Sequence, residues 1–450
     1  MNALAQLYNE HPKPILFTSA VALRLLLAIA FPALPDLLTL RAEISTPVNS
    51  FKRLQEGLFL YERGLDPYDG GIFYQAPLLL PLFSLLPSPA TFFGRIVSVA
   101  LYTVLDVLSA DCLYEIAASG VAGVSSVYAS PRRKDGWKPV SVAAVYLFNP
   151  FTLLTCLARP TTVFTTCFIL LSIRQATQAK ANATAFALAI ASYSSLHPLL
   201  LLPPIGLLCY DQSCKAPQQP SKDGGRSGKQ ATTSTTKPTP LSFTTIFLTP
   251  FLLTLLLLLT LSRLLLPSST FLSTLYLTPL SLPDLTPNPG LWWYFFTEMF
   301  DAFRAFFLGV FWLHMLAYSA PFTIRLRKQP LAAIVAMQGV LAIFQPYANV
   351  GDVGAWLAAT CLMSHLFPIT STHRYPFPAL AALLYASLLG PAFHHLWLYA
   401  GSGNANFFYA ISLVWALALL ILETDFVYAC LRDEWEVERP GVKGRVARQV

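Results

Sequence analysis

Most of this chain consists of long apolar runs separated by short polar segments. An α-helix rises about 1.5 Å per residue, so about 20 apolar residues cross the hydrocarbon core of a bilayer. The pattern therefore predicts an all-α polytopic membrane protein with about twelve transmembrane helices, in a single integral-membrane domain over residues 1–450. The predicted spans are 14–34, 91–117, 140–157, 161–174, 183–197, 198–210, 241–266, 291–320, 330–346, 352–369, 376–398 and 406–431.

Basic residues are distributed unevenly among the connecting segments. The loops at 267–290, 346–351 and 399–405 contain neither Lys nor Arg. Because basic loops stay in the cytosol, these three loops are predicted to face the lumen and both termini to be cytosolic. The segments rich in Lys and Arg then fall on the cytosolic side: 132–138, 174–180, 215–237, 325–328 and the tail at 432–450.

Two polar segments differ in their capacity to fold. The first lumenal loop, 35–76, is predicted to be structured, with Ser50 capping an amphipathic helix. Phe51, Leu54, Leu58 and Tyr61 recur at three- and four-residue steps, and we expect this stripe to lie on the membrane surface. The segment 211–240 is rich in Ser, Thr, Gly, Lys and Pro. It has too few apolar residues to form a core, which predicts a disordered cytosolic loop.

Composition narrows the class of protein further. Apolar residues make up 55% of the 450 and charged residues 12%, which excludes an ordinary soluble enzyme. The net charge of +7 does not indicate nucleic acid, because the basic residues lie between spans. The seven cysteines form no Cys-x-x-Cys pair and no metal-ligand spacing. No metal, cofactor or catalytic residue is predicted.

Several ionisable residues lie inside predicted spans, where each charge costs about 2.5–3.5 kcal/mol on insertion scales. They are Arg24, Arg95, Asp106, Asp111, Glu115, Arg263, Glu298, Asp301 and Arg304. The last three advance by three residues, which predicts a polar face on one helix over 292–311, directed into the bundle. Three interpretations are open: pairing between helices, placement near helix ends in the headgroup layer, or a polar groove for a lipid-linked ligand.

Amide, imidazole and aromatic groups gather between the last two predicted spans. Residues 394–409, called the rim here, read HHLWLYAGSGNANFFY. Aromatic rings with polar edges suit the headgroup layer, and glycines allow close backbone approach. The rim is therefore either an ordinary interfacial aromatic belt or the edge of a lipid-binding site. His394 and His395 have no sequence neighbours that would complete a catalytic triad.

Long strings of this sequence resemble the GPI transamidase subunit PIG-U family. They are SFKRLQEGLFLYERGLDPYDGGIFYQAPLLLPLF from Ser50, FNPFTLLTCLARPTTVF from Phe148, PNPGLWWYFFTEMFDAFRAFF from Pro287, VGDVGAWLA from Val350 and HHLWLYAGSGNANFFYAISL from His394. The family typically has Trp where Phe51 stands. The strings are spread over most of the chain, so the resemblance covers its spans and its first loop.

This resemblance implies a multi-pass subunit of the endoplasmic reticulum membrane, non-catalytic itself, in the complex that attaches GPI anchors to proteins. The implied partners are a caspase-like catalytic subunit, PIG-T, PIG-S, a metallopeptidase-like subunit and the GPI lipid. It also implies a multi-span bundle similar to GT-C glycosyltransferases. The rim is then predicted to hold the GPI headgroup and upper acyl chains through His395, Trp397, Tyr399, Asn404, Asn406, Phe407 and Phe408.

Two other functions compete with this one. A GT-C glycosyltransferase using a dolichol-phosphate sugar would need an acid soon after the first span, and Asp36 and Glu43 are so placed. A transporter would explain the charges within spans, although matching interrupted helices in two halves are not evident.

Overall fold

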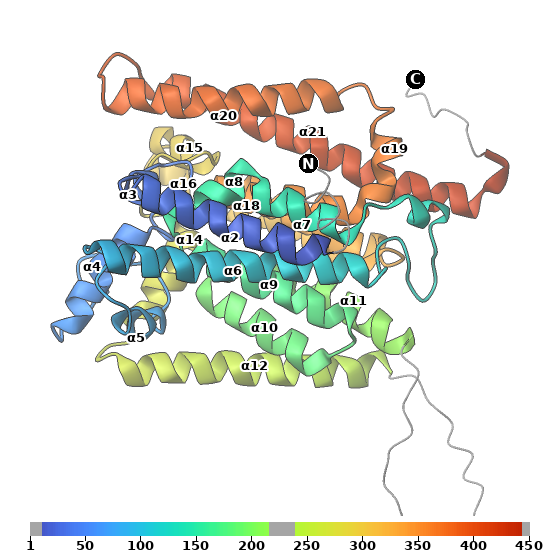
Figure 1. The fold of residues 1–450 in the computed structure, drawn as a ribbon, viewed down its shortest axis with the longest axis horizontal. Coiled ribbons are helices and arrows are strands. Elements are labelled where there is room, and N and C mark those ends of the chain that lie inside the picture. The colour runs from blue at the N-terminus through green and yellow to red at the C-terminus, as the bar shows by residue number, and fades with distance from the viewer. Residues whose placement is uncertain (1–10, 216–238, 443–450) are drawn as a thin grey trace, which may run out of the picture.

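The computed structural model describes residues 11–215 and 239–442, and almost all of their regular structure is helical. Figure 1 shows long helices running side by side, with the turn between α20 and α21 at one end of the bundle. That end is called the rim end below. The main helices are α2 (Pro12–Ala30), α6 (Phe92–Ala118), α7 (Pro139–Phe148), α8 (Pro150–Ala158), α9 (Thr162–Thr177), α10 (Ala181–Ser194), α11 (Leu202–Lys215), α12 (Pro240–Leu265), α16 (Asp301–Arg325), α17 (Pro330–Phe344), α18 (Val350–Thr360), α20 (Pro376–Leu398) and α21 (Ala405–Glu438).

The helical class is confirmed, but the predicted count of twelve spans is not. Within the described residues, seven helices are long and apolar enough to cross a membrane, or eight if α7 and α8, bent by 55°, form one span. Four other predicted spans, α9, α10, α11 and α17, are only 14 to 16 residues long. At about 1.5 Å per residue they fall short of a hydrocarbon core about 30 Å thick.

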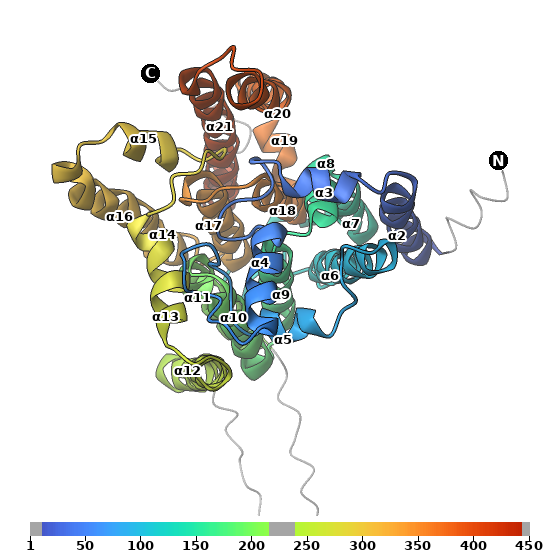
Figure 2. The same cartoon turned by 90° about the vertical axis from the view of Figure 1, so that its left-hand side faces the viewer.

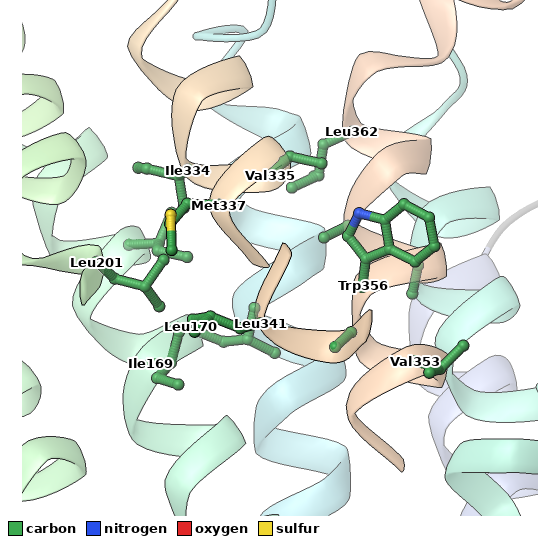
Figure 3. Close-up of a cluster of buried hydrophobic side chains, with 14 of the residues drawn as sticks. Ile169, Leu170, Leu201, Ile334, Val335, Met337, Leu341, Val353, Trp356 and Leu362 are labelled. Carbon is green, nitrogen blue, oxygen red and sulfur yellow. The ribbon is translucent and has the colours of Figure 1, made fainter. Parts of the chain in front are cut away.

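The centre of the bundle is α17, which is apolar on all sides. Its Ile334, Val335 and Met337 are completely or almost completely buried. In Figure 3 they lie between Leu201 on the left and Trp356 of α18 on the right, above Leu170 of α9. A helix that is hydrophobic on all sides belongs inside a bundle. Because protein surrounds α17, it can be shorter than the hydrocarbon core is thick. By contrast, α12 and α16 lie at the edge of the bundle in Figure 2, with many large apolar side chains exposed.

The predicted helix over 292–311 is two helices, so the proposed single polar face is wrong. Here α15 (Trp292–Glu298) ends before α16 begins at Asp301, and both acidic side chains are exposed. Across the break, Trp292 contacts Phe311 of α16 with ring centroids 5.0 Å apart, a contact that one straight helix would not allow. Arg304 satisfies carbonyl groups near the break by donating to Leu282 O at 2.6 Å and Phe296 O at 3.3 Å.

The first loop, 35–76, is structured as predicted, with α3 (Leu34–Thr39) and α4 (Phe51–Glu62). The expectation that the stripe on α4 lies on the membrane surface is wrong. Phe51 and Leu54 are buried against α5 (Leu79–Ser84) and α6, where the Phe51 ring meets Phe83 at 6.0 Å. The Ser50 side chain makes no capping hydrogen bond, and its carbonyl instead accepts one from Gln75 Nε2 at 2.6 Å.

The remaining predicted segments lie partly outside the described residues. Of the loop at 211–240, residues 216–238 are outside, while α11 continues to Lys215 and α12 begins at Pro240. Of the tail at 432–450, residues 443–450 are outside, and α21 continues through 432–438. This part of α21 is held to the bundle by ion pairs, with Arg132 2.6 Å from Asp433 and Arg325 2.8 Å from Glu434.

Candidate functional site

A cavity of about 500 Å³ lies between the α20–α21 hairpin and the rest of the bundle. In Figure 2 this hairpin forms one edge of the molecule, above α3 and α8. The cavity is lined by Leu37, Leu38, Arg41, Glu43, Ile44, Phe151, Leu154, Pro289, Val350, Ala386, Ser387, Gly390, Pro391, Ala392, His395, Phe408, Ile411, Ser412 and Trp415. Its volume falls within the range of about 300–1,000 Å³ typical of small-molecule sites.

The walls of the cavity are mainly aliphatic and aromatic. The first loop contributes Leu37 and Leu38 from α3, and α8 contributes Phe151, whose ring lies 5.5 Å from Trp415 of α21. Pro391 lies inside α20 and has no backbone N–H, so the helical hydrogen bond to the carbonyl of Ser387 is missing. Such a surface suits hydrocarbon chains better than a sugar or a peptide alone.

Arg41 and Glu43 line the cavity and form an ion pair with each other. The Arg41 side chain meets Glu43 through two nearly parallel bonds, Nη2 to Oε1 at 2.9 Å and Nε to Oε2 at 3.2 Å. Arg41 Nη2 also lies 3.5 Å from Pro391 O, and the backbone oxygen of Glu43 accepts from Val350 N at 2.9 Å. The pair therefore connects the first loop to α20 and α18.

The structure divides the seven predicted rim residues into two groups. His395 and Phe408 line the cavity, whereas Trp397, Tyr399, Asn404, Asn406 and Phe407 lie around the α20–α21 turn and do not line it. Whether either group holds a lipid stays a prediction.

Most of the turn residues have structural contacts. Asn404 caps α21, because its Oδ1 accepts from Phe407 N at 3.3 Å. Asn406 Oδ1 accepts a hydrogen bond from the Tyr294 hydroxyl of α15. Trp397 stacks on Trp293 at 5.9 Å. The rim is thus held in place by α15, a contact between segments far apart in the sequence.

Sequence reasoning did not select Arg41, Ser387, Gly390 or Ser412 as part of a site, and it considered Glu43 only as a possible catalytic acid. These residues lie on two helices and in the first loop, and no local motif joins them. The one available signal was charge: Arg41 and Glu43 are two residues apart, just after a short apolar segment.

For most of the predicted intramembrane charges, the structure favours pairing between helices. Arg24 Nη2 lies 2.5 Å from Asp106 Oδ2, and the same nitrogen donates to Leu147 O at 2.9 Å. Further along α6, Lys13 lies 2.7 Å from Asp111 and 3.3 Å from Glu115.

The acids considered for a glycosyltransferase are also paired. Asp36 lies 2.5 Å from Arg159 and 3.3 Å from Arg95, and Glu43 is bound by Arg41 as described above. Arg159 adopts a left-handed backbone conformation with φ of 63° and is buried, which fixes the guanidinium toward the loop. Each of the two carboxylates is thus paired with at least one guanidinium group. Among the described residues, no group of three or more His, Cys, Asp or Glu could hold a metal ion.

Comparisons with known proteins agree with the resemblance seen in the sequence. The chain matches the family described as GPI transamidase subunit PIG-U over residues 18–415. It is 33% identical over 431 residues to the human GPI-anchor transamidase component PIGU, covering 94% of each chain. It is also 33% identical over 433 residues to the GPI transamidase component GAB1 of Saccharomyces cerevisiae, covering 95% of this chain and 97% of that protein. The GAB1 homolog of Schizosaccharomyces pombe is 34% identical over 412 residues, 91% of each chain. The protein therefore belongs to the PIG-U family of GPI transamidase subunits.

Proposed function

We propose that this chain is a non-catalytic membrane subunit of the GPI transamidase, and that it holds the GPI lipid in the cavity beside the α20–α21 hairpin. The observation that carries the proposal is the cavity itself, whose walls are mainly apolar and include one Arg41–Glu43 ion pair. Apolar walls suit acyl chains, and the ion pair suits a polar headgroup. The lipid would then be presented from the side of the bundle at the rim end.

The cysteines support a non-catalytic role. A thiol nucleophile needs a nearby base and access to an aqueous peptide. Six of the seven cysteines are buried, and the seventh, Cys214, is half-buried near the end of α11. The nucleophile for anchor transfer would therefore come from a partner, the caspase-like subunit, with PIG-T, PIG-S and the metallopeptidase-like subunit completing the complex.

The proposed location is the endoplasmic reticulum membrane, with the rim end in the lumen. This orientation rests on the absence of Lys and Arg from the loops at 267–290, 346–351 and 399–405. With this orientation, the cavity beside the α20–α21 hairpin would lie toward the side where a secreted protein receives its anchor. The polar groups of the first loop would then lie in the same compartment as the headgroup.

A purification and a cell assay test this function. The tagged chain is purified from detergent-solubilised membranes, and we expect a stable complex that contains a cysteine protease subunit. In cells lacking the native chain, Ile411→Trp, which places a large ring in the cavity, should assemble into the complex but reduce surface GPI-anchored protein. Leu413→Trp, on the exposed face of α21, is the matched control. A chain that purifies without a protease subunit would contradict the proposal, as would normal anchoring by an assembled Ile411→Trp complex.

A further inference from the structure

The Arg41–Glu43 pair has hydrogen-bonding capacity that its protein neighbours do not use. A guanidinium has five N–H donors. Three are directed at Glu43 and Pro391 O, and within the described residues no hydrogen bond is found at Nη1. Each Glu43 carboxylate oxygen accepts one bond from Arg41, so each keeps a further lone pair. Both residues line the cavity, so donors and acceptors of opposite charge are presented to whatever enters it.

The charge of the pair indicates what it would recognise. A cation alone favours an anion, but Arg41 is already neutralised by Glu43, so this pair gives the cavity no excess charge. A ligand with a single negative charge would meet attraction from Arg41 and repulsion from Glu43. A ligand with adjacent opposite charges would meet a complementary partner for each one.

We propose that Arg41 and Glu43 together recognise a zwitterionic glycolipid headgroup, in which Arg41 binds a phosphodiester and Glu43 binds a neighbouring ammonium group. This inference rests on the function proposed above. In a glycosylphosphatidylinositol, the free amine of glucosamine lies next to the inositol phosphate, so one short segment of the headgroup supplies both charges. The pair distinguishes this headgroup from phosphatidylinositol, which has the phosphate alone, and from the N-acetylated glycolipid, whose nitrogen is neutral.

The geometry explains why the pair can keep its own bonds while the ligand is bound. The Nη1 donors point away from those engaged by Glu43, because the guanidinium is a rigid planar fork. Phosphate oxygens accept from that free edge, while the ammonium donates to the unused lone pairs of Glu43. Val350 N, bound to Glu43 O at 2.9 Å, fixes the backbone beneath the carboxylate.

The test uses the assembled transamidase complex in detergent and three defined lipids: phosphatidylinositol, glucosaminyl-phosphatidylinositol and N-acetylglucosaminyl-phosphatidylinositol. Relative affinities are measured by competition in native mass spectrometry. The wild-type complex should prefer the glucosaminyl lipid about tenfold over its N-acetylated form, as one charge-assisted hydrogen bond would give. Glu43→Gln should bring that ratio close to one without weakening phosphatidylinositol. Glu43→Asp should restore part of the preference, and Arg41→Gln should weaken all three lipids.

The control is Glu62→Gln, which removes an exposed carboxylate from α4 outside the cavity and should leave every ratio unchanged. A wild-type complex that binds the two glycolipids equally would overturn the headgroup assignment and leave the lipid-holding function intact. An assembled Glu43→Gln complex that keeps the full preference would do the same. If the wild-type complex binds none of the three lipids, the proposed function fails together with this inference.

Discussion

Two Arg–carboxylate pairs in this molecule use the same chemistry in opposite surroundings. Arg24 and Asp106 are 2.5 Å apart, with side chains 0% and 2% exposed, and Arg24 also donates to Ala20 O and Leu147 O. Arg41 and Glu43 are 2.9 Å apart, with side chains 25% and 11% exposed, beside the cavity. The first pair is enclosed by protein, whereas the second borders an open volume.

The difference indicates that the surroundings of an ion pair decide whether it contributes to folding or to ligand binding. An enclosed pair satisfies its own charges and joins α2, α6 and α7, so its loss is a loss of folding free energy. A pair beside a cavity contributes less to folding because water screens it, and it keeps free donors and acceptors. Folding and ligand binding should therefore respond separately to changes at the two pairs.

The largest expected effect is at the enclosed pair. Asp106→Ala leaves the Arg24 guanidinium buried without its carboxylate, which should lower the free energy of unfolding by about 3–5 kcal/mol. Thermal unfolding in detergent measures this. The control, Glu62→Ala on the exposed side of α4, should stay within about 0.5 kcal/mol of wild type. A similar small change for Asp106→Ala would show that the pair is not enclosed as described.

Two glycines allow the same comparison between the enclosed core and the cavity to be made for side-chain packing. A methyl group at Gly339 of α17 would lie 2.3 Å from the Glu423 carboxyl and 2.7 Å from Trp356 Nε1. Gly339→Ala should therefore destabilise the protein by about 1–3 kcal/mol through overpacking. The matched change beside the cavity is Gly390→Ala, whose methyl group would meet only Ile411 at 3.7 Å. That variant should be neutral or slightly more stable, since Ala favours a helix over Gly. Equal destabilisation by both changes would contradict the distinction between core and cavity.

A change at the Arg41–Glu43 pair should affect lipid binding more than the stability of the fold. Arg41→Ala should change the free energy of unfolding by about 1 kcal/mol or less, as expected for a partly exposed ion pair. It should nevertheless reduce the GPI retained by the purified complex by about tenfold, since hydrogen bonds to charged groups contribute about 1.5–3 kcal/mol. Unfolding and lipid content are measured on one sample. A large loss of stability with unchanged GPI would mean that Arg41–Glu43, like Arg24–Asp106, serves the fold and not the lipid.

A stability effect as small as that at Arg41 is expected at the α20–α21 turn. Asn404→Lys removes the cap of α21, which should cost about 1 kcal/mol, and Asn406→Ala removes the acceptor for Tyr294. If the turn also contacts the headgroup, as the sequence predicts, each change should lower GPI retention by about five- to hundredfold. Undiminished GPI in both assembled variants would leave the turn as an aromatic belt whose polar groups serve the fold.

The apolar pattern predicted where helices occur but not how far each one extends. The stripe on α4 was identified correctly, yet its packing partners Phe83 and Tyr102 come from later segments, so burial inside the bundle was not predictable from the local pattern. The break between α15 and α16 accompanies the contact of Trp292 with Phe311, which a helical period does not encode.

The candidate site was predicted only at its edge. His395 and Phe408 were chosen because they belong to the rim, whose composition is unusual. Arg41 was missed because it meets Pro391, a residue of α20 far along the chain. Glu43 was weighed as a catalytic acid because its cation could not be assigned from the sequence. Because the site is formed by segments far apart in the chain, no characteristic residue spacing in the sequence reveals it.

The most direct test of the account is the amount of GPI bound when the cavity is filled. Ala392→Trp places an indole on a cavity-lining position that is exposed, so folding should tolerate it. Leu413→Trp, on the exposed face of α21 outside both the cavity lining and the rim, is the control. Lipid is extracted from equal amounts of each assembled complex and GPI is quantified by mass spectrometry. We predict wild-type GPI in Leu413→Trp and at least a tenfold loss in Ala392→Trp. Equal GPI in all three complexes would contradict the claim that this cavity holds the lipid.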